Sequence, residues 1–178
     1  QAAISISGTT TSHARQRATR EFISVMAAPY HGGPVHRPHP RRMSRTTVFT
    51  VDVQWGDCDP ADIVFFPNFS RWMDAASLHF FRQCGVPRWR ELEDTRGIVG
   101  TPLLEINTRF YKPATYGDRL EVHTSVERWD AKVFVQHHRV LRGDTLLCEG
   151  RETRAFVQRV DGRLKAIPVP EDIKALCR

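Results

Sequence analysis

Three carboxylates lie close together in residues 55–68, and their spacing is compatible with a catalytic site. Asp57, Asp59 and Asp62 fall within six residues, beside Gly and Pro, which is a composition typical of a turn. A carboxylate can act as a nucleophile or as a base toward water. A helix that begins nearby would add free backbone N–H donors for a developing oxyanion. The same residues could equally form a solvated acidic loop that caps the helix, and the segment alone leaves both interpretations open.

Hydrophobic periodicity predicts the elements that hold this turn. Residues 47–54 alternate apolar and polar side chains, which is typical of a strand with one buried face. In residues 68–84 apolar side chains recur at three- and four-residue steps, which predicts a long amphipathic helix. We expect Asn68 to be its N-cap and Gly85 its C′ residue. Residues 87–94 predict a short second helix, with Trp89 and Leu92 facing inward.

The pattern of apolar residues and turn signals in the rest of the chain predicts strands. Four runs rich in apolar residues cover 104–110, 119–126, 132–141 and 146–160, and turn signals separate them. The short connections favour antiparallel pairing. We therefore expect an α+β domain in which a bent antiparallel sheet of about five strands wraps the long helix.

Ordered motifs in this region also resemble those of a known family. They are Gly56-Asp57-Cys58-Asp59-Pro60-Ala61, Phe66-Pro67-Asn68, Arg71-Trp72-Met73-Asp74-Ala75-Ala76-Ser77, Arg96-Gly97-Ile98-Val99-Gly100-Thr101-Pro102 and Val133-Phe134-Val135-Gln136. Together they resemble the 4-hydroxybenzoyl-CoA thioesterase family, whose members have the hot-dog fold. The resemblance runs from about residue 47 to the end of the chain.

The resemblance implies roles for individual residues. Asp59 would be the catalytic carboxylate, and the backbone N–H of Phe66 would polarise the thioester carbonyl, while Asp57 would be structural. The implied substrate-binding residues are Asp74, Trp89 and Thr101, and the implied CoA-binding residue is Lys132. For Asp74 we expect a place on the interior side of the helix, facing a substrate hydroxyl. The alternative is that Asp74 pairs with Arg71 or bonds to the backbone.

Two positions depart from the family pattern. The family usually has Gly where this chain has Asp62, which suggests backbone with a positive φ. Close family members also carry a basic run that holds the CoA phosphates, and only Lys132 of that run is present here.

A thiol nucleophile at Cys58 is disfavoured, because the flanking carboxylates would raise its pKa.

The function implied is hydrolysis of an aryl acyl-CoA thioester, most simply a hydroxybenzoyl-CoA, without a metal or redox cofactor. Family members are homodimers joined edge to edge, commonly paired into homotetramers, with sites at the dimer interface. Two other functions stay open: a short-chain or aliphatic acyl-CoA thioesterase, and a non-catalytic acyl- or nucleic-acid-binding protein. We do not find the His–Asp motif expected of a hot-dog hydratase.

Composition separates the chain into two parts. Residues 1–45 hold seven Arg and one Glu, so residues 46–178 carry 19 basic and 19 acidic side chains. We expect 1–45 to be a disordered basic extension and 46–178 to be the hot-dog thioesterase domain. Nucleic-acid binding would rest on this extension alone. Four Cys without metal-ligand spacing and the lack of a long apolar run favour a cytoplasmic protein with no membrane partner.

Overall fold

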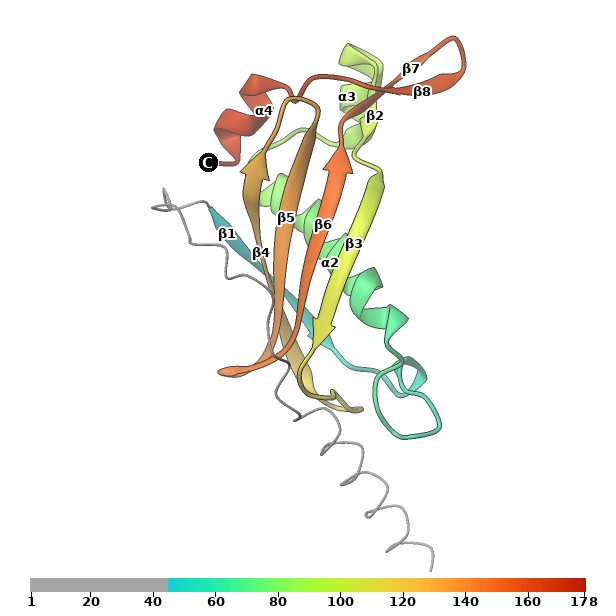
Figure 1. Cartoon of the computed structure of the whole chain (residues 1–178), viewed down its shortest axis with the longest axis vertical. Helices are drawn as coiled ribbons and strands as arrows, with labels where there is room; N and C mark the ends of the chain where they lie inside the picture. The colour runs from blue at the N-terminus through green and yellow to red at the C-terminus, as the bar shows by residue number, and fades with distance from the viewer. Residues whose placement is uncertain (1–44) are drawn as a thin grey trace, which may run out of the picture. The chain divides into compact units, whose positions relative to one another are not determined.

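The structure, a computed structural model, describes residues 45–178, so the predicted basic extension lies outside the described residues except for Arg45. In chain order the elements are β1 (Thr46–Asp52), the 3-10 turn η1 (Trp55–Asp57), α2 (Pro67–Gln83), α3 (Trp89–Arg96), β2 (Ile98–Gly100), β3 (Leu103–Phe110), β4 (Arg119–Trp129), β5 (Val133–Arg142), β6 (Thr145–Ala155), β7 (Val157–Val160), β8 (Arg163–Ala166) and α4 (Glu171–Leu176). Figure 1 shows their arrangement.

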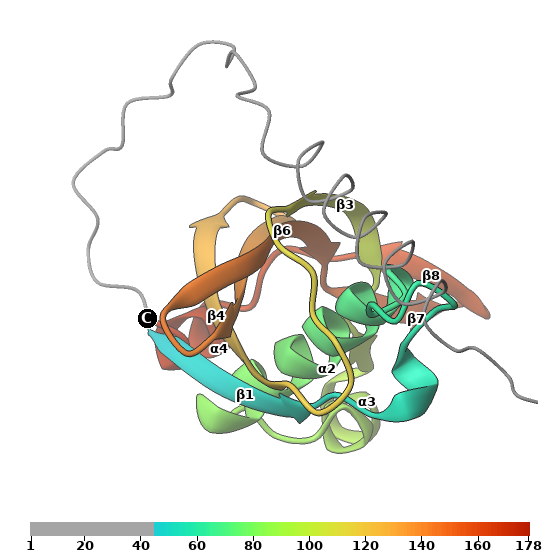
Figure 2. The same cartoon turned by 90° about the horizontal axis from the view of Figure 1, so that it is seen from below.

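Five strands form one antiparallel sheet in the order β1–β4–β5–β6–β3. Alternate residues of β4 are buried, namely Leu120, Val122, Thr124 and Val126, because this side of the sheet faces the core. Figure 2 shows the sheet curving around α2. The predicted α+β arrangement of a long helix and a bent five-stranded sheet is confirmed.

The long helix α2 buries the predicted apolar stripe against the sheet. It ends as expected, because Gly85 follows the C-cap Cys84 with a φ of 82°. Its start differs from the prediction: Phe66 is the N-cap, and Pro67 begins the helix. Proline suits that position because its φ is preset and it has no N–H to satisfy. Asn68 is therefore already helical, and its buried side chain bonds elsewhere.

The helix lies very close to the sheet where Met73 crosses β6. A Cβ atom added at Gly150 would collide with the Met73 sulfur, so any larger residue there would force the buried Met73 side chain to shift. Met73 belongs to a cluster of buried residues around the first half of α2, and Phe80 and Phe81 belong to a second cluster around its other end. Close packing along α2 therefore sets its position against the strands.

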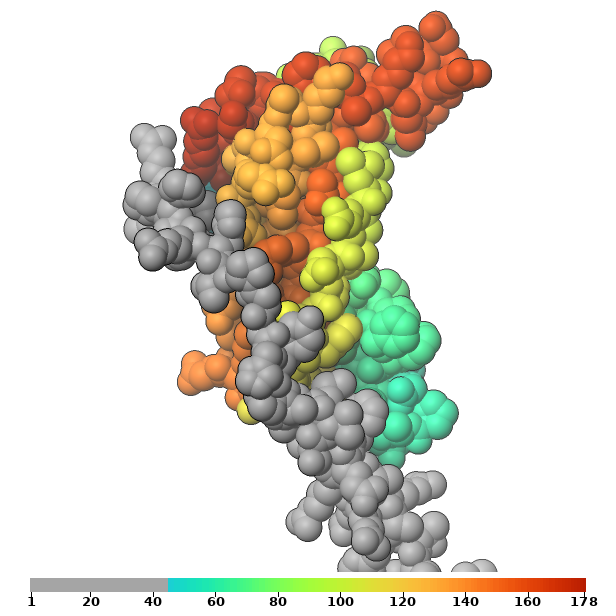
Figure 3. All heavy atoms as spheres, in the orientation of Figure 1, coloured from blue at the N-terminus to red at the C-terminus, as the bar shows by residue number. Residues whose placement is uncertain are grey.

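The strand predicted over residues 146–160 is in fact two strands. It breaks at Phe156, whose fully buried ring contacts those of Phe81, Phe134 and Trp89. Beyond it, β7 leaves the main sheet and pairs with β2 and β8 in a small second sheet. The β7–β8 hairpin stands out from the main sheet in Figure 3.

None of the described helices is long and apolar enough to span a membrane.

Candidate active site

Backbone hydrogen bonds fold the acidic turn between β1 and α2 into a defined shape. The carboxylate of Asp57 accepts from the Gln54 N–H at 2.9 Å. The Asp57 carbonyl accepts from the Phe65 N–H at 2.8 Å and from the Asn68 side chain at 2.9 Å. Asp57 thus ties the turn to both flanking segments, in line with the structural role expected of it.

Asp59 holds the tip of the turn with only one of its carboxylate oxygens. Oδ1 accepts from the Ala61 N–H at 2.8 Å, and the Asp59 N–H donates to the Ile63 carbonyl at 2.8 Å. Within residues 45–178, Oδ2 takes part in no hydrogen bond, so it is available to a ligand or to water. Asp62, where a glycine was expected, does have a positive φ of 61°.

The start of α2, which follows the turn, offers a backbone N–H donor at Phe66. At the start of α2 the N–H groups of Asn68 and Phe69 already donate to the carbonyls of Phe65 and Phe66, and Pro67 has no N–H. The expected group of several free donors is therefore reduced. The Phe66 N–H makes no hydrogen bond within the part of the chain that the structure describes, and Phe66 is 64% exposed. It lies at the positive end of the helix dipole, where an oxyanion is stabilised.

The thiol of Cys58 is poorly suited to act as a nucleophile. Burial raises its pKa, and the charges of Asp57, Asp59 and Asp62 raise it further, against a smaller lowering effect of a hydrogen bond with the Tyr116 backbone. Since the thiolate is the reactive form, this environment suppresses its reactivity, as the sequence predicted.

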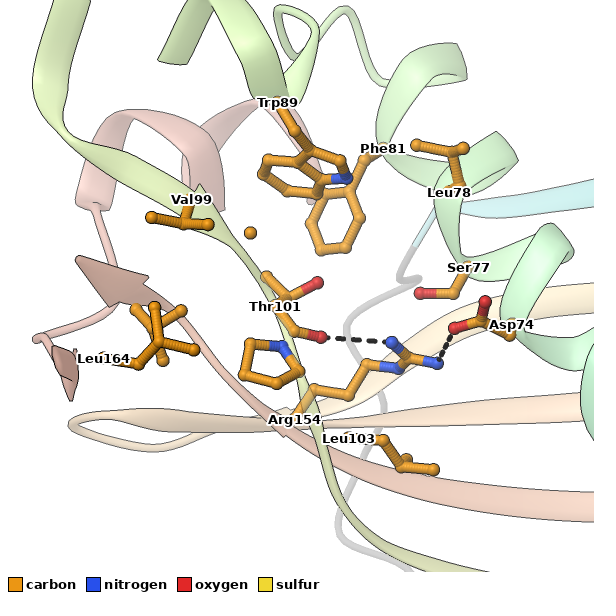
Figure 4. A pocket seen from close by; sticks show the side chains of 13 residues that line it. Asp74, Ser77, Leu78, Phe81, Trp89, Val99, Thr101, Leu103, Arg154 and Leu164 are labelled. Atoms are coloured by element: carbon orange, nitrogen blue, oxygen red, sulfur yellow. Dashed lines mark hydrogen bonds and ion pairs between the residues drawn. The ribbon is translucent and has the colours of Figure 1, made fainter. Parts of the chain in front are cut away.

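A cavity of about 450 Å³ lies between the second half of α2, α3, β2 and β7–β8. Asp74, Trp89 and Thr101, the three residues singled out for substrate binding, all line it. Figure 4 shows its aromatic and aliphatic wall, which includes Phe81, Val99 and Leu164. An apolar cavity with a few polar groups is suited to an aromatic ring that carries a polar substituent.

The setting of Asp74 differs from the prediction. Its side chain is 71% exposed rather than on the interior side of α2, because the buried stripe runs along its neighbours Trp72, Met73 and Ala76. Its partner is Arg154, whose Nη2 donates to Asp74 Oδ1 at 2.7 Å. The alternative partner Arg71 instead donates to Asn68 Oδ1 at 2.9 Å.

Arg154 and Glu152 were missed by sequence reasoning. They are two residues apart on β6, so both point toward the side of the sheet that faces the core. The available signal was the spacing of Glu152 and Arg154, which puts both charged side chains on one face of a strand, where burial would require each to have a partner. Ser77 also lines the cavity, and its hydroxyl donates to the buried Gln136 side chain at 2.6 Å.

Lys132 does not join this group. It is an exposed residue in the turn between β4 and β5, and it does not line the cavity. Among the described residues, no three His, Cys, Asp or Glu side chains converge in a way that could hold a metal ion.

Within one chain, Asp59 lies far from Trp89 and Thr101, which line the cavity. Asp59 and Phe66 precede α2, whereas Trp89 and Thr101 follow it. The 17 residues of α2 span about 25 Å at about 1.5 Å per residue. Figure 1 accordingly shows the acidic turn and α3 at opposite ends of α2.

Comparison with known proteins gives this arrangement a context. Residues 53–176 match the model of the thioesterase-like superfamily. The chain is 44% identical over 140 residues to the 4-hydroxybenzoyl-CoA thioesterase of Pseudomonas sp. (strain CBS-3), which covers 76% of this chain and 99% of that protein. It is 30% identical over 128 residues to the 1,4-dihydroxy-2-naphthoyl-CoA hydrolase of Thermosynechococcus vestitus, which covers 69% of this chain and 82% of that protein.

Solved structures agree with these relatives. A crystal structure of a 4-hydroxybenzoyl-CoA thioesterase mutant in complex with 4-hydroxybenzoyl-CoA matches with a TM-score of 0.72 at 41% identity, over 75% of this chain and 99% of that one. A gentisyl-coenzyme A thioesterase matches with a TM-score of 0.65 at 30% identity, over 74% of this chain and 100% of that one.

Proposed function

The chain belongs to the thioesterase-like superfamily and has the hot-dog fold, and we propose that it hydrolyses 4-hydroxybenzoyl-CoA or a close hydroxybenzoyl-CoA. The observation that carries this proposal is the pairing of a carboxylate and a donor on one turn. Asp59 has an unengaged oxygen, and Phe66 at the start of α2 has an unengaged N–H. These are the two groups that acyl transfer from a thioester requires.

In the proposed reaction the Phe66 N–H binds the thioester carbonyl oxygen and stabilises the charge that develops there. Asp59 attacks the carbonyl carbon, or takes a proton from a water that does so. The C–S bond breaks, and CoA leaves as a thiolate that is then protonated. Water supplies the second oxygen of the product carboxylate. No metal or redox cofactor is needed for this sequence.

We propose that the working unit is a homodimer joined through β3, paired into a homotetramer. β3 is an outer strand of the sheet, and it exposes the apolar side chains of Leu103, Leu104 and Ile106. In Figure 3 this strand lies at the surface between the acidic turn and β7–β8. An exposed apolar edge strand is a template for pairing with another strand.

This pairing would complete the site. Leu103, at the start of β3, lines the cavity, whereas the ring of Phe110, at its end, lies 5.3 Å from that of Phe69 in the first turn of α2. In an antiparallel pair of β3 strands related by a two-fold axis, the start of one strand lies beside the end of the other. The cavity of one protomer would then lie beside Asp59 of the partner subunit.

Mixing two impaired variants tests the shared site. Asp59→Asn removes the carboxylate, and Thr101→Trp fills the cavity. If each dimer has two shared sites, random exchange of subunits should restore about a quarter of wild-type activity, because half of the dimers carry one intact site. A mixture no more active than its components, after exchange has been verified by mass, would place the whole site in one chain.

For the acyl group we propose that Trp89 and Thr101 help to enclose the ring and that Asp74 accepts a hydrogen bond from its hydroxyl. A site that hydrogen-bonds a substrate hydroxyl rejects the analogue that lacks it, because the acceptor is left unpaired. We therefore expect kcat/KM for 4-hydroxybenzoyl-CoA to exceed that for benzoyl-CoA by about ten-fold or more. Asp74→Ala should remove most of this difference.

Steady-state rates with the two thioesters and with a short aliphatic acyl-CoA decide the matter. Equal rates for the two aryl substrates, or faster turnover of the aliphatic one, would favour a general acyl-CoA thioesterase instead.

We further propose that Lys132 contacts the CoA phosphates and that the protein works in the cytoplasm. There its free thiols, Cys58, Cys84, Cys148 and Cys177, would stay reduced. The proposal involves neither a membrane nor nucleic acid.

A further inference from the structure

Arg154 connects the two sides of the cavity. Its guanidinium, on β6, donates from Nη2 to Asp74 Oδ1 at 2.7 Å and from Nη1 to the Thr101 carbonyl at 3.1 Å. It also donates from Nε to Glu152 Oε2 at 2.8 Å. Figure 4 shows the guanidinium between Asp74 and Thr101. One buried side chain thus contacts both polar residues that the proposed function assigns to the ring.

Glu152 anchors Arg154 from the core. Glu152 is 1% exposed and Arg154 is 5% exposed, so each charge needs the other. Burial raises the pKa of Glu152, but the neighbouring His138 and Arg154 lower it by more, and the carboxyl is therefore held in its charged form. His138 is itself fixed, with Nδ1 2.9 Å from the Thr124 hydroxyl oxygen and Nε2 3.3 Å from Glu152 Oε2.

Arg154, held in place by Glu152, fixes the orientation of the Asp74 carboxylate. An exposed Asp on a helix surface would otherwise sample several rotamers, and ordering it would oppose ligand binding. The planar fork of an Arg can hold two carboxylates in fixed directions, which the single ammonium of a Lys cannot do. With Oδ1 bonded to Arg154, the other oxygen of Asp74 points away from the guanidinium in Figure 4. That oxygen makes no hydrogen bond within residues 45–178.

From these contacts we propose that Arg154 is a positioning residue, held by Glu152, that fixes Asp74 and the Thr101 backbone and so sets selectivity for a ring with a neutral hydrogen-bond donor. The inference rests on the proposed function. It also concerns charge: Arg154 lies between two carboxylates, so it has no unbalanced positive charge to offer an anion. The cavity should therefore disfavour a ring that carries a carboxylate, despite the arginine in its wall.

The test compares kcat/KM for 4-hydroxybenzoyl-, benzoyl- and 4-carboxybenzoyl-CoA. In Arg154→Met the preference for the hydroxyl should fall to within about three-fold of unity. Arg154→Lys should retain an intermediate preference, because it keeps the charge but not the fork. Arg151→Met is the matched control. Arg151 is also on β6 but pairs with Glu127 and Glu149 on the other face, so the preference should stay at its wild-type value.

A double variant separates positioning from general loss of structure. If Arg154 acts through Asp74, then Asp74→Ala and Asp74→Ala/Arg154→Met should have the same substrate preference. Should Arg154→Met fail to fold, the Lys variant and Glu152→Gln provide the same comparison, and both should weaken the preference.

Three outcomes would overturn the inference. They are a folded Arg154→Met with wild-type preference, independent effects in the double variant, and wild-type turnover of 4-carboxybenzoyl-CoA faster than that of benzoyl-CoA. Equal wild-type rates for the hydroxylated and bare rings would instead refute the proposed substrate, and the inference with it.

Discussion

Replacing Asp59 by Asn should separate catalysis from folding. The amide oxygen of Asn can still accept the hydrogen bond from the Ala61 N–H, so the turn keeps its 2.8 Å contact. What is lost is the negative charge that attacks or deprotonates. A positioned acid–base group contributes about 100-fold or more, so kcat should fall by at least that factor, or about 2.7 kcal/mol in the barrier. The free energy of unfolding should change by less than about 0.5 kcal/mol.

Replacing Asp57 by Ala should have the opposite effect. Its carboxylate accepts one hydrogen bond, from the Gln54 N–H at 2.9 Å, and alanine cannot replace that acceptor. Losing one partly exposed hydrogen bond costs about 1 kcal/mol, or about 4 °C in Tm for a domain of this size. The Asp57 carbonyl still binds Phe65 and Asn68, so the turn should persist and kcat should change by only a few-fold.

Two assays distinguish these effects. Release of the CoA thiol from 4-hydroxybenzoyl-CoA gives kcat and KM, and urea unfolding gives the free energy. Titration with a non-hydrolysable thioether analogue checks that Asp59→Asn still binds substrate. If Asp57→Ala were inactive but stable and Asp59→Asn unstable but active, our assignment of roles within the pair would be wrong.

Two further substitutions test the turn and the core. Cys58→Ser should leave kcat within about three-fold of wild type, because the environment already suppresses the thiolate; an inactive variant would make Cys58 a nucleophile again. Gly150→Ala should destabilise the domain by about 1–3 kcal/mol in urea unfolding, because the new methyl group meets the Met73 side chain, and adding Met73→Ala should recover part of that loss. No loss in Gly150→Ala would mean that α2 can move away from β6.

The main helix and sheet were predictable because burial on one face leaves a period in the sequence. Phe69, Trp72 and Met73 recur at helical spacing and are all buried. Alternate residues of β4 are buried in the same way. The family motif also predicted the left-handed conformation of Asp62, because a position usually occupied by glycine suggests a positive φ.

Contacts between distant residues could not be predicted in the same way. Arg154 and Asp74 are 80 positions apart, and no local pattern connects them. The strand break at Phe156 also depends on long-range packing, since the aromatic rings that surround it come from α2, α3 and β5. Asn68 looked like an N-cap by residue type, but Pro67 begins the helix, and the N-cap is therefore Phe66, two residues earlier than predicted.

The surface around the acidic turn connects assembly with catalysis. Trp55, Phe65, Phe66 and Tyr116 are each about half exposed or more, an unusual concentration of aromatic surface beside a carboxylate. A solvated carboxylate is a weaker nucleophile and base than one in a dry site, because water stabilises its charge. A second protomer that paired through β3 would cover apolar surface and exclude water from Asp59 at the same time. The same contact would thus stabilise the dimer and activate the proposed catalytic group, so loss of the dimer should lower kcat as well as substrate affinity.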